Sequence, residues 1–417
     1  MTKLFSAVLL CCFISTGVPT HAQSQQTSPQ VHSKYSILID VDSGKVMWAR
    51  GANVERQIAS TTKIMTALLL LERGHLQDQV TAPPGVDKIQ ESSLHLSPGE
   101  HLSLNDLLYA MLLRSANDTA VTGAVYLCGS VPEFVEQMNI KARQIGAVHT
   151  HFVTPNGLYA PGHHSTAFDL SIMARYAALT QPMFDKIVST QRHIIQRSIH
   201  KNDSLMINTA STFLKTFPGA DGIKTGYIHQ AGHCFVSSAT RNGWRLIAVA
   251  LDSGRCREDD MSLLNYGFYN FRKSLAVSAG NILGSVKLVD GALCVVGVLE
   301  NVNIPTSKWH RPPLFTTRFV PEARLPTTPV SRGTVVGTIE ISANGVLQSV
   351  VPAVLLSNAA PVATPVVSRP SSLDGTLRTM SLALLAFVAV GIGGLKLYAR
   401  TITKSTGRSW DRVPPRL

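Results

Sequence analysis

The chain has 417 residues, so it is long enough to build a hydrophobic core without depending on disulfide bonds between its six cysteines. Its formal net charge is +12, but six cations and one anion place +5 within residues 396–417, and Lys3 adds one more. About half of the excess therefore lies outside the predicted folded region, and the charge does not imply a nucleic-acid partner. The remaining positive balance fits either an anionic surface or substrate, or ordinary solvated Lys and Arg side chains.

Residues 1–22 have the pattern of a secretory signal peptide. Lys3 is followed by an apolar run over 4–14, and T-H-A at 20–22 is a suitable cleavage site. We therefore expect the mature chain to work outside the cytosol. Two cysteines leave with the signal, and the other four permit three disulfide pairings. Their disulfide state stays open, and we favour buried free thiols for Cys128, Cys234, Cys256 and Cys294.

Residues 30–275 mix strand and helix patterns and predict an α+β catalytic domain. Strand-like runs at 36–40 and 45–50 flank a D-S-G turn, and an N-G turn joins runs at 234–240 and 244–251. Helical patterns lie between and after these strands, at 60–73, 102–113, 121–127, 132–145 and 261–271. This order predicts an antiparallel sheet with its helices gathered elsewhere.

The rest of the chain predicts a small β-domain and a membrane anchor. Short β-type runs cover residues 277–358, at 285–289, 293–299, 314–320, 334–341 and 346–356. A linker containing proline follows at 359–378, and an apolar segment at 379–397 is long enough to span a bilayer. The tail at 398–417 is basic, so we expect it in the cytoplasm and the catalytic domain on the extracytoplasmic side.

The string S-T-T-K at residues 60–63 carries a nucleophile and a base. Ser60 and Lys63 are three residues apart on a predicted helix, so the two side chains share a face and the amine can reach the hydroxyl. Lys63 has to be neutral part of the time to act as the general base, and burial near Lys224 would favour that form. By itself the string is also compatible with an N-cap serine and a solvated lysine.

Two further strings supply the remaining parts of a site that attacks a peptide-like carbonyl beside a free carboxylate. S-A-N at 115–117 connects two predicted helices, where Ser115 is placed to relay a proton and Asn117 to hold Lys63 and the substrate. K-T-G at 224–226 precedes a predicted strand, and Gly226 leaves room for a substrate beside the backbone. Lys224 and Thr225 offer a charge and a hydroxyl to the carboxylate. The backbone N–H groups of Ser60 and Tyr227 form the expected oxyanion pair.

The three strings together resemble the D-alanyl-D-alanine carboxypeptidases, the low-molecular-mass penicillin-binding proteins of serine peptidase family S11. The resemblance extends over about residues 35–360 and includes framework strings at 58–66, 138–139, 154–158, 222–227 and 231–232. It implies a serine D,D-peptidase fold with a five-stranded antiparallel sheet and a C-terminal β-domain. It also implies that Ser60 forms an acyl-enzyme with peptidoglycan stem pentapeptides, releases the terminal D-alanine and is inhibited by β-lactams.

The same resemblance implies an arginine that binds the substrate carboxylate. Arg257 is the best match, and Arg255 remains an alternative because the spacing from Arg257 to the following helix is one residue short. No cofactor or metal is expected, since the histidines at 149, 151, 163 and 164 lie in polar loops without paired carboxylates. The expected partners are peptidoglycan stem peptides, β-lactams and membrane lipid, and not nucleic acid.

Three other functions use similar parts. A D,D-endopeptidase would cleave the same bond type in peptidoglycan cross-links, and the sequence leaves that preference open. A β-lactamase is disfavoured because no E-x-x-L-N string accompanies the three motifs. A non-enzymatic, membrane-tethered peptidoglycan-binding protein is disfavoured because all three motifs are intact. Neither the deacylation rate nor the oligomeric state follows from the sequence.

Overall fold

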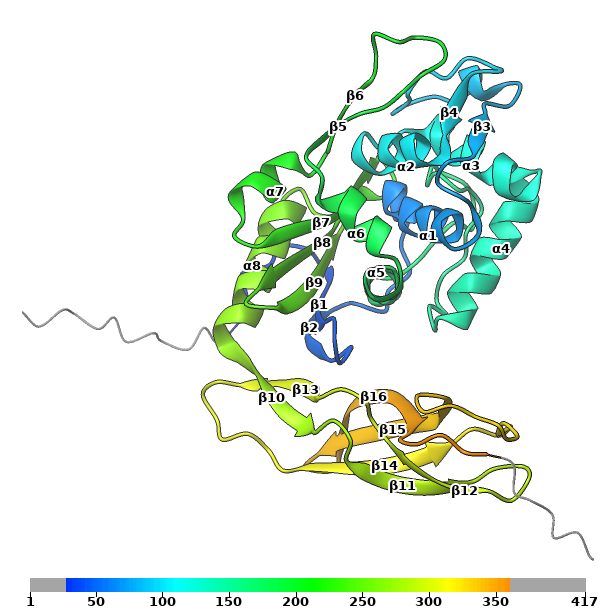
Figure 1. Ribbon diagram of the computed structural model, residues 1–417. Helices are drawn as coiled ribbons and strands as arrows, with labels where there is room; N and C mark the ends of the chain where they lie inside the picture. The colour runs from blue at the N-terminus through cyan, green and yellow to red at the C-terminus, as the bar shows by residue number, and fades with distance from the viewer. Residues whose placement is uncertain (1–27, 361–417) are drawn as a thin grey trace, which may run out of the picture. The chain divides into compact units, whose positions relative to one another are not determined.

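The structure is a computed structural model that describes residues 28–360 (Figure 1). Its largest sheet is fully antiparallel and has the strand order β2-β1-β9-β8-β7. The strands are β1 (Tyr35–Asp40), β2 (Val46–Arg50), β7 (Ala220–Ile228), β8 (Gly232–Arg241) and β9 (Trp244–Leu251). Strands from the two ends of residues 35–251 therefore pair in one sheet, because β1 lies between β2 and β9.

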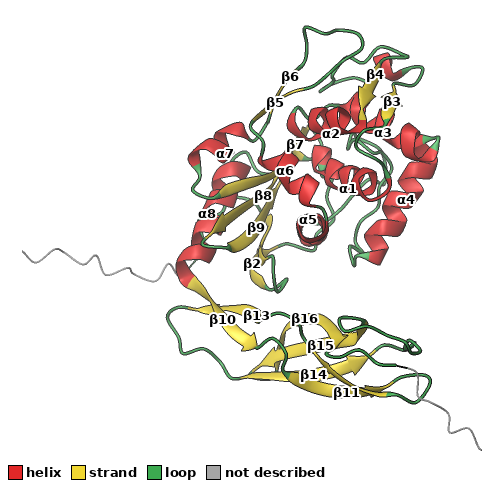
Figure 2. Cartoon of the chain, viewed as in Figure 1, coloured by secondary structure: helices red, strands yellow, loops and turns green. Residues whose placement is uncertain are grey.

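The sheet is covered on both faces. Along β1, Ile37 and Ile39 pack in the larger hydrophobic cluster, whereas Leu38 packs in a second cluster with Leu263 and Leu264. This alternation is the two-residue period of a strand that is buried on both sides. Helix α8 (Cys256–Asn270) lies on one face, and α5 (Ala167–Thr180) and α6 (Pro182–Ser189) lie on the other (Figure 2).

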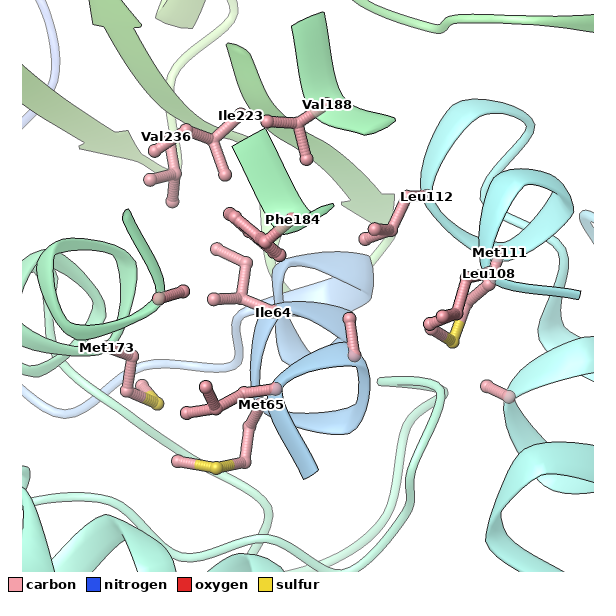
Figure 3. Packing of buried hydrophobic residues seen from close by; sticks show 14 of the residues in the cluster. Ile64, Met65, Leu108, Met111, Leu112, Met173, Phe184, Val188, Ile223 and Val236 are labelled. Carbon is pink, nitrogen blue, oxygen red and sulfur yellow. The ribbon is translucent and has the colours of Figure 1, made fainter. Parts of the chain in front are cut away.

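Helix α1 (Lys63–Arg73) forms the centre of the helical part. Its first eight residues are all buried, and Ile64 and Met65 lie among side chains from several other helices and from the sheet (Figure 3). The surrounding helices are α2 (Leu104–Leu113), α3 (Asn117–Cys128), α4 (Val131–Gln144), α5 and α6. A helix that is apolar on nearly every side belongs in a core of this kind.

Shorter elements complete the helical part. A 3-10 turn, η1 (Ala59–Thr62), leads into α1, and another, η2 (Val86–Lys88), lies between two strands. β3 (Gln79–Thr81) pairs with β4 (His101–Ser103), β5 (Arg192–Ile194) pairs with β6 (Leu205–Ile207), and α7 (Ser211–Thr216) precedes β7. Together, the antiparallel sheets and their helices confirm the predicted α+β class.

A second antiparallel β-region follows α8. β10 (Phe271–Val277) pairs with β13 (Val302–Ser307), and five strands form a sheet of order β11-β12-β16-β15-β14. Those five are β11 (Ile282–Lys287), β12 (Leu293–Gly297), β14 (Phe315–Pro321), β15 (Val335–Ala343) and β16 (Val346–Leu355). Their inward residues, among them Val296, Ile339 and Leu355, form a hydrophobic cluster of their own. β10 begins at Phe271, a position that the sequence pattern assigned to a helix.

The four cysteines of the described region are free thiols. Cys234 and Cys294 are buried, and Cys128 and Cys256 are partly exposed. Burial raises the pKa of Cys234 to about 12, so this thiol stays protonated and unreactive at neutral pH. Within residues 28–360 no helix has both the length and the hydropathy needed to cross a membrane. The predicted signal peptide at 1–22 and the predicted span at 379–397 lie outside the described residues.

Candidate active site

The predicted nucleophile and base lie side by side at the start of the central helix. Ser60 is part of η1, and Lys63 is the first residue of α1. The sequence pattern placed Ser60 at the N-terminus of the α-helix itself; it sits instead in a 3-10 turn, preceded by Ala59 in a left-handed conformation (φ 48°). Lys63 Nζ lies 2.9 Å from Ser60 Oγ, which is hydrogen-bond distance.

The other contacts of Lys63 Nζ fix the direction of its lone pair. The amine donates to Asn117 Oδ1 at 2.7 Å and to the main-chain oxygen of Asn156 at 2.7 Å. Both of these atoms are acceptors only, so a neutral amine uses its two N–H groups on them. Its lone pair is then left for the hydroxyl of Ser60. This arrangement orients the neutral lysine to accept the proton of the nucleophile.

Lys63 is fully buried, and burial is the main reason why its pKa lies well below that of a solvated lysine. The positive charge of Lys224 lowers the pKa further. Asp118 and Glu91 act in the opposite direction and raise it. The neutral form that a general base requires is therefore favoured by the fold itself.

The S-A-N string forms the turn between α2 and α3. Ser115 has a left-handed backbone (φ 66°), and Asn117 begins α3. Asn117 is held from both ends, because its N–H donates to Ser92 O at 2.7 Å and its Nδ2 donates to Gln90 O at 3.1 Å. The Ser115 side chain is mostly buried, and within residues 28–360 its hydroxyl makes no hydrogen bond. The turn thus brings Asn117 into contact with Lys63 and leaves the Ser115 hydroxyl uncommitted.

The K-T-G string lies on the edge strand β7, next to η1. Lys224 is buried, its Nζ donates to Thr225 O at 2.9 Å, and burial lowers its pKa to about 7. The Thr225 hydroxyl donates to Thr209 Oγ1 at 2.7 Å. A Cβ at Gly226 would lie only 3.0 Å from Ser60 N, so a side chain at this position would crowd the nucleophile. Tyr227 follows, half exposed, with its ring against that of His233.

The two candidate arginines lie at the start of α8. Arg255 is exposed at the N-cap position, and Arg257 is half-buried in the first turn. The predicted helix at 261–271 begins earlier in the structure, at Cys256, because its first turn is polar and carries no apolar period. Within the described region neither arginine forms a hydrogen bond or ion pair with Lys224, Thr225 or Gly226. The buried Nε of Arg257 has no hydrogen-bond partner there, so one donor of this side chain is free.

Sequence reasoning missed three residues that act on Lys63. Asn156 contributes a main-chain oxygen, for which a side-chain pattern gives no signal. Asp118 is buried and accepts from Ser93 Oγ at 2.7 Å and from the N–H groups of Leu94 and Leu96. Glu91 is exposed in a left-handed conformation (φ 65°). Across residues 28–360, no group of three or more His, Cys, Asp or Glu side chains could hold a metal ion.

Comparisons with known proteins agree with this geometry. The sequence profile of the D-alanyl-D-alanine carboxypeptidases matches residues 21–254. The chain is 31% identical to D-alanyl-D-alanine carboxypeptidase DacF of Bacillus subtilis over 303 residues, which cover 70% of this chain and 77% of that protein. It is 28% identical to DacD of Escherichia coli over 360 residues, covering 81% and 89%.

A solved structure shares the same architecture. Penicillin-binding protein 5 from Haemophilus influenzae superposes with a TM-score of 0.64 at 26% identity, covering 80% of this chain and 99% of that chain. The similarity extends beyond residues 28–275, which contain the three motifs, since 80% of the chain is a larger share than those residues alone represent.

Proposed function

Because the chain belongs to the D-alanyl-D-alanine carboxypeptidase family, we propose that it is a serine-type peptidase that removes the terminal D-alanine from peptidoglycan stem pentapeptides. Ser60 Oγ attacks the carbonyl of the penultimate D-alanine, and its proton passes to Lys63 Nζ. The C–N bond then breaks, and the departing amine takes up a proton relayed through Ser115. An ester on Ser60 remains, and water hydrolyses it, which returns the proton to Ser60.

One observation carries this proposal: Lys63 Nζ lies 2.9 Å from Ser60 Oγ while two acceptors take up the N–H groups of the neutral amine. The backbone N–H groups of Ser60 and Tyr227 stabilise the oxyanion, where each donor lowers a barrier of this type by about 3 to 4 kcal/mol. Lys224, Thr225, Gly226 and Asn117 hold the substrate as a strand added to the edge of β7.

The test compares two substrates. Purified full-length protein is incubated with a stem pentapeptide and, separately, with a D,D-cross-linked dimer of stem peptides. Release of free D-alanine from the pentapeptide at the higher rate supports the carboxypeptidase. Preferential release of monomer from the dimer would identify an endopeptidase. Rapid turnover of penicillin would identify a β-lactamase. No product from either peptide would contradict a peptidase of any kind.

Lys224 makes carboxylate binding dependent on pH. Its pKa of about 7 means that the cation is lost as the pH rises through neutrality, whereas a solvated lysine would stay charged. With the Ser60→Ala variant, which binds without reacting, the Kd of a D-Ala-D-Ala peptide should rise about tenfold for each pH unit above that pKa. In the Ser60→Ala, Lys224→Arg double variant the cation persists, so the Kd should stay level from pH 6 to 9. Equal slopes in the two proteins would contradict this role.

Arg257 is the proposed second partner of the substrate carboxylate, because it is the residue that best matches the carboxylate-binding arginine of the family. Losing a charge-assisted hydrogen bond costs about 1.5 to 3 kcal/mol, so Arg257→Ala should lower kcat/KM for D-Ala-terminated peptides roughly 10- to 150-fold. Arg255→Ala is the matched control, since it removes an exposed arginine two residues away. A loss confined to Arg255→Ala would move the role to that residue.

We also propose that the chain is exported and anchored. The signal peptide at 1–22, the linker at 359–378 and the span at 379–397 support an extracytoplasmic catalytic domain with a cytoplasmic tail at 398–417. The β-region at 277–358 then acts as a spacer or docking module. Membrane lipid is accordingly a partner and nucleic acid is not.

Anchoring of this type resists extraction. Alkaline carbonate and high salt should leave the full-length protein in the membrane pellet, because an apolar span is held by its burial in the hydrocarbon core and not by charge. A Ser405→Cys variant should be protected from an impermeant thiol reagent on cells with a permeable outer envelope. Carbonate release, or labelling at this cysteine, would instead indicate a helix lying on the outer surface.

A further inference from the structure

His163 lies directly behind the active site, in surroundings that differ from those expected from the sequence. The pattern placed this residue in a polar loop, but the side chain is fully buried, with its ring edge-on to Phe152 at 5.8 Å. Its neighbour His164 does lie near a carboxylate, because His164 Nε2 is 3.6 Å from Glu55. Among residues 28–360, His163 itself forms no hydrogen bond or ion pair with an acidic side chain.

The hydrogen bonds of His163 define a single tautomer. Its Nδ1 accepts from the backbone N–H groups of Val153 at 3.1 Å and Thr154 at 3.4 Å, so this nitrogen carries no proton. Its Nε2 lies 2.9 Å from Thr62 Oγ1. The Thr62 hydroxyl gives its own proton to Ala59 O at 2.8 Å, so it accepts from Nε2–H. The ring is therefore a neutral bridge with one acceptor and one donor.

The two ends of this bridge meet the two sides of the nucleophile. One end holds Thr62 and, through it, the carbonyl of Ala59, the left-handed residue immediately before Ser60. The other end holds the loop that contains Asn156, whose carbonyl takes one N–H of Lys63. The same loop is pressed against the nucleophile turn, since a Cβ at Gly157 would lie 1.9 Å from Ala59 O.

We propose that His163 is a positioning residue of the acylation step. Its ring fixes the Asn156 carbonyl relative to the Ser60 turn, so that the lone pair of Lys63 points at the nucleophile. It touches neither substrate nor reacting atoms. The inference rests on the proposed function, because it assigns His163 a part in the attack by Ser60.

The environment keeps this ring neutral under working conditions. Burial first, and then the charges of His151 and His164, lower the pKa of His163 to about 4. His151 and His164 each place Nδ1 within 3.0 Å of Gly162 O, and Glu55 lies beyond His164. On the opposite side the ring faces the uncharged Thr62. A proton on Nδ1 would in addition confront the two backbone N–H donors of Val153 and Thr154.

The kinetic test measures acylation of the full-length protein by a fluorescent penicillin, with the acylation rate constant k2 separated from the non-covalent dissociation constant. His163→Ala and Thr62→Val should each lower k2 about 10- to 100-fold and leave the dissociation constant unchanged. His163→Gln should recover most of the rate, because its amide also places an acceptor and an N–H donor on one carbon atom. Asn270→Ala is the matched control: it removes a buried hydrogen-bonding side chain outside the site and should keep the wild-type k2.

A spectroscopic test is independent of activity. In nitrogen-15 histidine spectra, one ring should show a protonated Nε2 and an unprotonated Nδ1 and should remain neutral at pH 5, where exposed histidines are charged. That signal should disappear in His163→Gln. An unchanged k2 in His163→Ala, or a ring that titrates with the exposed histidines, would overturn the inference. Failure of the wild-type protein to be acylated at all would contradict the proposed function instead, and the spectrum would still report on the bridge.

Discussion

The Ser60→Ala variant should lose acylation by penicillin entirely and should release D-alanine at least about 10⁴-fold more slowly than the wild-type protein. The large size follows from the geometry, since Ser60 Oγ is the group that lies 2.9 Å from the buried amine of Lys63. Without it no acyl-enzyme forms, and the remaining donors can only bind the substrate. Mass spectrometry of a penicillin-labelled tryptic digest should place the wild-type adduct on the peptide that contains Ser60.

Ser189→Ala is the control for this experiment, because Ser189 is an exposed serine at the end of α6. It should be labelled on the Ser60 peptide at the wild-type rate. An adduct that survives Ser60→Ala, or one that maps to a different peptide, would show that another residue is the nucleophile.

Gly157→Ala should be among the most damaging single substitutions in the chain. Gly157 has φ +84°, and its added Cβ would lie 1.9 Å from Ala59 O and 2.8 Å from Thr62 Oγ1. The first of these atoms is backbone, so the clash is relieved only by moving the Ser60 turn or the Asn156 loop. We expect a loss of at least about 4 kcal/mol in the free energy of unfolding, together with a collapse of the acylation rate. Urea unfolding followed by tryptophan fluorescence measures the first effect.

Gly146→Ala separates the clash from the backbone conformation. Gly146 has nearly the same dihedral, φ +88°, but a Cβ there meets nothing within 4 Å. The free energy of unfolding of this variant should therefore fall only by the cost of a left-handed alanine, about 1 to 2 kcal/mol. Its acylation rate should stay at the wild-type value. Similar losses in the two variants would mean that the packing of Gly157 against Ala59 does not constrain the site.

The sequence predicts the strands and helices with the clearest periodicity. The turns at 42–44 and 242–243 place β1, β2, β8 and β9 to within a residue or two, because alternating apolar residues and turn signals coincide there. Helices α5 and α6 were not predicted. Buried residues occur around much of α5, so its apolar positions do not select one face. The first residue of β10, Phe271, was assigned to a helix because it follows α8 without a break.

The site follows the same logic. Ser60, Lys63 and Asn117 could be predicted because their side chains carry the chemistry at short, fixed spacings, and the structure brings these three into contact. The Asn156 carbonyl could not be predicted, since any residue type offers a main-chain oxygen. His163 is equally hidden, because the partners of its ring are backbone N–H groups and a threonine from a segment about a hundred residues away.

The burial of α1 determines which parts of the enzyme can open locally without unfolding of the whole domain. The amide protons of residues 64–70 sit in a helix enclosed by other elements, so they should exchange with deuterium only when the whole domain unfolds. Local opening is then confined to segments outside this helix, such as the exposed β5–β6 hairpin, where Ile194 and Leu205 face solvent. The candidate serine–lysine pair is thus attached to a helix that we expect to open last, and a protease acting on the native protein should cut the hairpin long before it reaches that pair.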